Sequence, residues 1–109
     1  MTFDEGLAQR IREALADERG VEEKRMFGGL AFMVDGHMAC GVVDSDLMIR
    51  LGEKGAAAAL SEEHVRPMDF TGRPLRTMAY VGADGVAEDE DLAAWVQRAV
   101  KHARSLPPK

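Results

Sequence analysis

The fold is decided by residues 30–51, LAFMVDGHMACGVVDSDLMIRL, in which apolar residues recur with the two-residue period of β-strands. Asp35-Gly36 is among the strongest two-residue hairpin signals, because both central positions of a type I′ turn need a positive φ. A second polar turn, at 44–46, reverses the chain again. The stretch therefore predicts an antiparallel meander. Its three strands are expected at residues 24–34, 37–43 and 47–51, with a bulge or a sharp twist at Gly28-Gly29.

Helical patterns lie on both sides of this meander. A capping box at Thr2–Glu5 and an apolar stripe from Phe3 to Leu15 predict a first helix. Further elements are expected as a short alanine-rich helix at 52–60, strands at 65–70 and 75–81, and a last helix at 89–105. We therefore expect one domain, residues 1–109, of the α+β class. Its order is helix, three strands, helix, two strands, helix.

Composition excludes several classes of protein. The chain has 109 residues, of which 46% are apolar and 30% charged, so it is expected to be globular. The single cysteine, Cys40, cannot form an intrachain disulfide. The net charge of −5 argues against direct nucleic-acid binding, and no apolar run approaches the ~20 residues that span a bilayer. With an acidic N-terminus in place of a secretory signal, the expected location is the cytoplasm.

Hairpin geometry predicts which residues share a face of the sheet. A two-residue loop at Asp35-Gly36 sets Met33 opposite Met38 and Phe32 opposite Ala39. The face expected under the helices carries Ala31, Met33, Met38, Cys40, Val42, Leu47, Ile49 and Leu51. The other face is expected to carry Leu30, Phe32, Val34, His37, Ala39, Val43, Met48 and Arg50, joined by Asp69, Arg76, Met78 and Tyr80 from the second hairpin.

This second face is too apolar for a sheet surface that meets water, and three short helices can hardly cover both faces. We predict that it is a self-complementary dimer surface or a ligand cleft. The residues expected to form it are Leu30, Phe32, Val34, His37, Met48, Arg50, Arg76 and Tyr80. In the alternative arrangement, the last helix crosses this face and completes a two-sided core.

No motif predicts catalysis, a metal or a cofactor. His37 and Cys40 are three residues apart on a strand, so they point to opposite faces and cannot share a metal ion. Cys40 is expected to be an inert core residue. Nowhere does the sequence bring together a nucleophile, a base and an orienting group. If the second face were a ligand pocket, the polar groups converging there would be His37, Arg50, Asp69, Arg76 and Tyr80.

Three stretches carry a resemblance to a known family. They are KRMFGGLAFMVDGHM at 24–38, DLMIRL at 46–51 and RPMDFTGRPL at 66–75, followed by the last helix with Trp95. Together they resemble the N-terminal domain of TfoX/Sxy proteins. The resemblance implies an α+β fold like that of secretion chaperones, with dimers formed through the sheet side. It provides no catalytic residues.

The best-known members of that family are two-domain regulators of natural competence that act with the cAMP receptor protein at promoters. This sequence contains no counterpart of their second, helical domain. We therefore expect a stand-alone TfoX-like domain: a small, cytoplasmic, non-enzymatic regulatory module that forms a homodimer and contacts a protein partner such as a transcription regulator. The alternative hypothesis is a small-molecule-binding protein or an uncharacterised enzyme that uses the same face.

Overall fold

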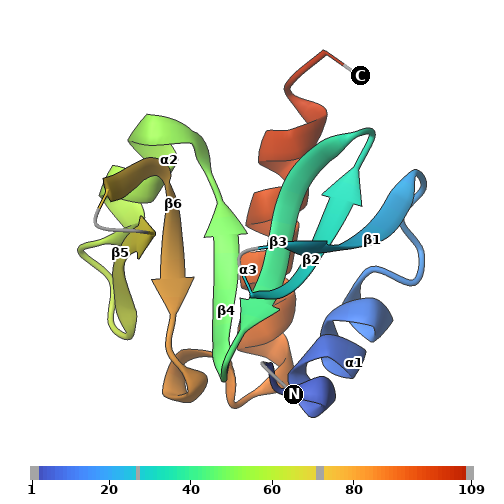
Figure 1. Ribbon diagram of the computed structural model, residues 1–109, viewed down its shortest axis with the longest axis horizontal. Coiled ribbons are helices and arrows are strands. Elements are labelled where there is room, and N and C mark those ends of the chain that lie inside the picture. Colours follow the sequence, from blue (N-terminus) through green and yellow to red (C-terminus); the bar gives the residue numbers. More distant parts are fainter. Residues whose placement is uncertain (1–2, 27, 71–72, 108–109) are drawn as a thin grey trace.

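The computed structural model describes residues 3–26, 28–70 and 73–107 (Figure 1). Within them the helices are α1 (Glu5–Ala14), α2 (Gly52–Ala59) and α3 (Asp89–Arg104), with a 3₁₀ turn at Ala83–Val86. The strands are β1 (Val21–Met26), β2 (Gly29–Val34), β3 (His37–Val43), β4 (Asp46–Arg50), β5 (Val65–Phe70) and β6 (Arg73–Val81). They form one antiparallel sheet in the order β1-β2-β3-β4-β6-β5.

The α+β class and the alternation of helix and sheet segments are confirmed, but the segment predicted as one strand over 24–34 is divided into β1 and β2. The two strands pair as a hairpin around Gly28, whose φ of 74° is open to glycine. Gly29 then lies so close to β3 that a Cβ would meet the Val42 carbonyl oxygen at 2.0 Å. The paired glycines therefore make a turn and a close approach, not a bulge. Phe27 lies outside the described residues.

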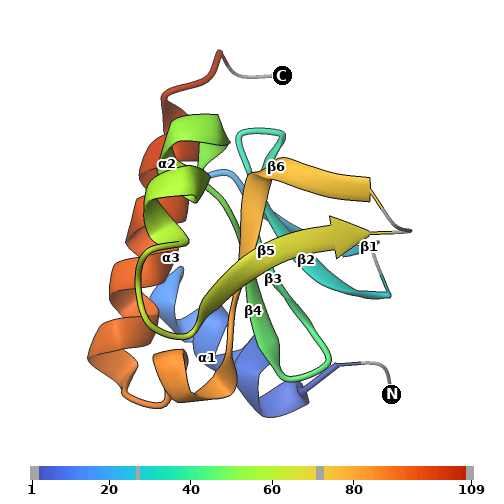
Figure 2. The same cartoon turned by 90° about the vertical axis from the view of Figure 1, so that its left-hand side faces the viewer.

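Helices α1 and α3 cover one face of the sheet (Figure 2). Helix α1 is capped by Asp4, whose Oδ1 accepts from the Leu7 amide at 3.1 Å, whereas the predicted cap Thr2 lies outside the described residues. Helix α3 buries Leu92, Trp95, Val96, Ala99, Val100 and Ala103 against the sheet. The helix-covered face is the main core. Helix α3 contacts β2, β3 and β4 there, so it covers the part of the predicted second face that carries Leu30, Phe32 and Val34, but it does not cross the face that carries Met48 and Tyr80.

The β2–β3 hairpin begins in the predicted register and then departs from it. Asp35 and Gly36 both have positive φ, 53° and 85°, and Met33 faces Met38 as predicted. Phe32, however, faces Cys40, because one extra residue, Ala39, is accommodated in a bulge of β3. A one-residue shift moves side chains to the other face of a sheet.

The consequence is a correction to the predicted faces. The β2 residues Leu30, Phe32 and Val34 lie in the helix-covered core, and Met33 and Met38 lie on the opposite, helix-free face. In β4 the predicted faces are confirmed. The turn falls at Asp44-Ser45, so Val42 faces Leu47 and Cys40 faces Ile49, and the β4 side chains lie on their predicted faces.

Strands β5 and β6 do not pair evenly along their length. Pro67 faces Ala79, but two residues further on Asp69 faces Pro74, so several residues of β6 are accommodated opposite Met68 alone. Figure 2 shows the result: β6 bends, and the end of β5 and the start of β6 project away from the helices, on the same side as the β1–β2 hairpin. The sheet therefore curls around its helix-free face.

Candidate functional site: the methionine face

The helix-free face of the sheet is built mainly from methionine. Six of the seven methionines of the chain belong to one apolar cluster on this face. The cluster, called here the methionine face, consists of Met26, Met33, Met38, Met48, Met68 and Met78 with Ala31, Val43, Leu75 and Tyr80. The helix-covered core is composed differently, of leucine, valine, isoleucine, alanine and aromatic residues.

Strand register explains why these side chains meet. Residues facing one another across the sheet form a continuous row of Lys24, Ala31, Gly41, Met48, Tyr80 and Arg66. The middle of this row is filled by small residues, which leave room for long side chains beside them. A Cβ at Gly41 would lie 2.6 Å from the Met48 Cε, so Gly41 is needed for the Met48 side chain to lie where it does.

The methionine face is closed at its centre and partly open at its rim. Met48 and Met68 are completely buried, and Met38 and Met78 are 7% and 8% exposed. The rim residues Met26, Met33, Val43, Leu75 and Tyr80 are only partly buried. The curled β5–β6 hairpin contributes Met68 and Met78 to this closed centre, while the rim stays in contact with solvent.

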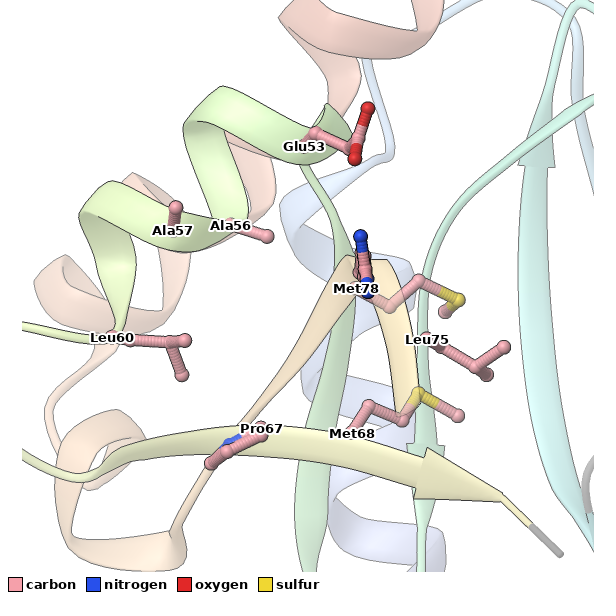
Figure 3. Close-up of a pocket in the computed structure, with 9 residues that line it drawn as sticks. Glu53, Ala56, Ala57, Leu60, Pro67, Met68, Leu75 and Met78 are labelled. Atoms are coloured by element: carbon pink, nitrogen blue, oxygen red, sulfur yellow. The ribbon is translucent and has the colours of Figure 1, made fainter. Parts of the chain in front are cut away.

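At one side the methionine face continues into a groove between α2 and the β5–β6 hairpin (Figure 3). The groove encloses about 280 Å³. It is lined by Ala56, Ala57 and Leu60 from α2 and by Pro67, Met68, Leu75 and Met78 from the hairpin, with Glu53 and Arg76 as its charged residues. Leu60, 43% exposed, is the one large apolar residue among those described that is exposed to water.

Two local features create this groove. The uneven pairing of β5 and β6 separates the strands beside Met68, and the alanines of α2 are too short to fill the space. Because Met68, Leu75 and Met78 belong to both the groove and the methionine face, the two form one continuous apolar surface.

Around this surface the described cationic side chains outnumber the acidic ones, which include Glu22, on this side by register, and Glu53 in the groove. Lys24 and Arg50 lie on the methionine face by register, and Arg76 lines the groove; none of them makes an ion pair with a described residue. Arg66 is bound to Asp46 and stacks over the Tyr80 ring at 5.0 Å. The hydrogen bond to Asp46 raises the pKa of Arg66, which keeps this guanidinium charged.

The structure separates the predicted site residues into two groups. Met48, Arg50, Arg76 and Tyr80 lie on the helix-free side, on the methionine face or in its groove. Leu30, Phe32, Val34 and His37 lie on the helix-covered side, because of the bulge at Ala39.

His37 is buried, with its Nε2 2.5 Å from the Pro107 carbonyl oxygen and no described partner for its Nδ1. Because its ring lies on the covered side, it cannot join Arg50, Arg76 and Tyr80 around one ligand. The pocket predicted from these residues is therefore not assembled. The side chain of Asp69, its fifth predicted member, lies outside the described residues.

The other side chains that could take part in a reaction, the Cys40 thiol and the His102 imidazole, are unreactive or have no catalytic group beside them among the described residues. Cys40 is fully buried, and burial raises the pKa of its thiol to about 12. Burial lowers the pKa of His102, with smaller contributions from the charges of Arg50 and His37. The described part of the chain holds no group of three His, Cys, Asp or Glu residues that could bind a metal ion. Nor does any described helix have the length and apolar character needed to cross a membrane.

Sequence reasoning placed Met33 and Met38 on the wrong face and did not select Met26 or Met68. One signal could have found the methionine face: nearly all methionines fall in strands, and Gly41 interrupts a strand, which is typical of a close approach or a bulge. The bulge at Ala39, which reassigns β2, has no comparable signal in the sequence.

Comparison with protein-family models gives one match, the TfoX N-terminal domain, over residues 13–103. The match includes all six strands of the described sheet together with α2 and most of α3. Comparisons with curated proteins and with solved structures found no match. Since the family model covers most of the sequence, the chain belongs to the TfoX N-terminal domain family.

Proposed function

We propose that this chain is a cytoplasmic, non-enzymatic regulatory module that binds a protein partner, such as a transcription regulator, on the methionine face. The observation that supports the proposal is the apolar rim and groove that remain open after the chain has formed its own core. Soluble proteins rarely leave a continuous apolar surface exposed unless something binds there.

The side chains of this surface suit protein binding. Methionine is unbranched and polarisable, so it can repack around partner side chains of different shapes. The groove of about 280 Å³ is large enough for one or two apolar anchors, such as a leucine or phenylalanine of the partner. Its walls come from separate elements, α2 and the β5–β6 hairpin, so an anchor would contact both.

Charge indicates the chemistry of the partner. Lys24, Arg50 and Arg76 have no described carboxylate partner, whereas the net charge of the chain is −5. An acidic segment would be attracted to this side of the molecule, and a basic one would be attracted to the acidic remainder. The proposed ligand is therefore a peptide segment with apolar anchors and flanking Asp or Glu residues.

Selection of peptides from a random displayed library tests this proposal. We expect the peptides enriched on the full chain to combine apolar and acidic residues. Binding should be lost in Met33→Glu, which places a carboxylate on the rim, and kept in Gln97→Glu, which adds the same charge at an exposed position of α3. Enrichment of basic peptides, or equal binding to both variants, would contradict the proposal.

We also propose that the chain forms a homodimer. Its interface cannot include Leu30, Phe32 and Val34, because these residues are buried beneath the helices. A second candidate function, binding of a small apolar molecule, is favoured by the groove alone. An NMR fragment screen distinguishes the two: fragments that shift the Met68 and Met78 methyl signals, in a protein that selects no peptide, would favour the small molecule.

A further inference from the structure

The two edges of the sheet are formed by β1 and β5, and they differ in how open they are to a further strand. All six residues of β1 pair with β2 without any shift in register. Its four central residues, Glu22 to Arg25, are exposed, and β2 is the only strand paired with β1 in the described sheet. An edge of this kind presents unpaired backbone N–H and C=O groups to solvent.

The opposite edge is protected. Strand β5 contains Pro67, which has no N–H to donate, and its pairing with β6 is interrupted beside this residue. A regular added strand would meet a missing donor and an uneven edge at β5. The edge that remains suited to pairing is β1.

We propose that a second copy of this chain pairs antiparallel with β1, with Glu23 facing Glu23 and with Glu22 facing Lys24 of the second copy. In an antiparallel pair, residues that face one another lie on the same side of the sheet. When the two strands are related by a two-fold axis, the residue on the axis faces its own copy. Glu22 and Lys24 both lie on the helix-free side, because they face Met33 and Ala31. The axis through Glu23 thus creates two Glu–Lys pairs there.

The like charges on the axis are already neutralised. Arg12 binds each Glu23 through two hydrogen bonds, of 2.7 and 2.8 Å, from the helix-covered side. The alternative axis through Lys24 is less favourable, because no described carboxylate neutralises Lys24. With the axis at Lys24, Glu23 of one copy would face Arg25 of the other. Both side chains already have partners: Glu23 binds Arg12, and the Arg25 guanidinium carbon lies 6.0 Å from the centre of the Phe3 ring.

Charged residues on an edge strand normally prevent association. Here two acidic residues, Glu22 and Glu23, precede two basic ones, Lys24 and Arg25, so an antiparallel copy places opposite charges face to face. The resulting dimer would join the two sheets into one, with both methionine faces on the same side. The proposal rests on the edge strand and is independent of what binds the methionine face.

Charge reversal at two positions tests this pairing by sedimentation velocity. The wild-type chain is expected to dimerise at or below ~100 µM, within the range of weak specific complexes. Glu22→Lys and Lys24→Glu each turn both attractive pairs into repulsive ones, and each should weaken the dimer about tenfold or more. Both side chains are exposed, so circular dichroism should show unchanged folding.

Two further samples identify the register. The double variant Glu22→Lys/Lys24→Glu restores both opposite-charge pairs and should dimerise like the wild type. An equimolar mixture of the two single variants should form a heterodimer, because each supplies the charge that the other lacks. Lys54→Glu, the same charge reversal at an exposed position of α2, is the matched control and should leave the dimer intact.

Three results would overturn the proposal. They are a wild-type monomer throughout this concentration range, single variants that both dimerise as tightly as the wild type, and a mixture of the single variants that stays monomeric while the wild type dimerises.

Discussion

The two faces of the sheet are both apolar, yet they are built from different residues and differ in how completely they are covered. The helix-covered face holds branched and aromatic side chains such as Phe32 and Ile49, sealed by α1 and α3. The methionine face holds mainly unbranched side chains, covered by the curling of the sheet and beside α2, with a partly open rim. Stiff side chains specify one packing arrangement, whereas methionine accepts several. Stability and adaptability are thus assigned to opposite sides of one sheet.

Two neighbouring residues of β2, one on each face, provide the strongest test of this difference between the helix-covered face and the methionine face. Phe32→Ala removes a fully buried ring and should lower the free energy of unfolding by about 3–5 kcal/mol, because a cavity is left in the core. Met33→Ala, on the partly open rim, should cost about 1 kcal/mol or less. Urea denaturation of both variants measures the difference. If Phe32→Ala does not fold, Phe32→Leu replaces it in the same comparison, and equal costs at the two positions would refute this difference between the faces.

The reactivity of Cys40 tests how tightly the covered face is sealed. Burial raises the pKa of this thiol to about 12, which leaves very little thiolate near neutral pH. We expect Cys40 in the folded chain to react with a thiol-specific disulfide reagent at least about a hundredfold more slowly than in urea. Stopped-flow absorbance measures both rates. A folded-state rate close to that of a free thiol would show that solvent reaches this core.

A smaller effect on stability is expected from the ion pair between Arg12 of α1 and Glu23 of the edge strand β1. The hydrogen bond from Arg12 lowers the pKa of Glu23, so ionised Glu23 stabilises the folded chain. This contribution is complete above the unfolded pKa of ~4.3 and is lost as the pH falls through the lower folded value. Because both side chains are more than a third exposed, Glu23→Gln should cost only about 0.5 kcal/mol at pH 7.

At pH 3 the cost of Glu23→Gln should approach zero, as thermal unfolding at the two pH values would reveal. Glu22→Gln, one residue away and without a described ion pair, is the control and should show little change at either pH. A penalty at Glu23 that does not depend on pH would mean that the ion pair is not its source.

Local features of the fold could be predicted from the sequence, whereas features that depend on contacts between strands could not. Asp35-Gly36 sets a turn whose geometry is local, so this hairpin and the strands next to it could be predicted. The helices follow from caps and apolar stripes, which are also local. The bulge at Ala39 and the uneven pairing beside Met68 depend on how strands fit together across the sheet. Those two irregularities decide which face Phe32 occupies and how far the second face is covered.

The most direct test of the account is a methyl NMR titration of the chain, labelled with ¹³C at the methionine methyl groups, with the acidic apolar peptide selected on it. We predict that the signals of Met33 and Met26, on the rim, and of Met68 and Met78, in the groove, shift on binding. The shifts should be absent in Met33→Glu and retained in Gln97→Glu. Saturable binding of the peptide that leaves all four methyl signals unchanged would contradict the assignment of partner binding to the methionine face.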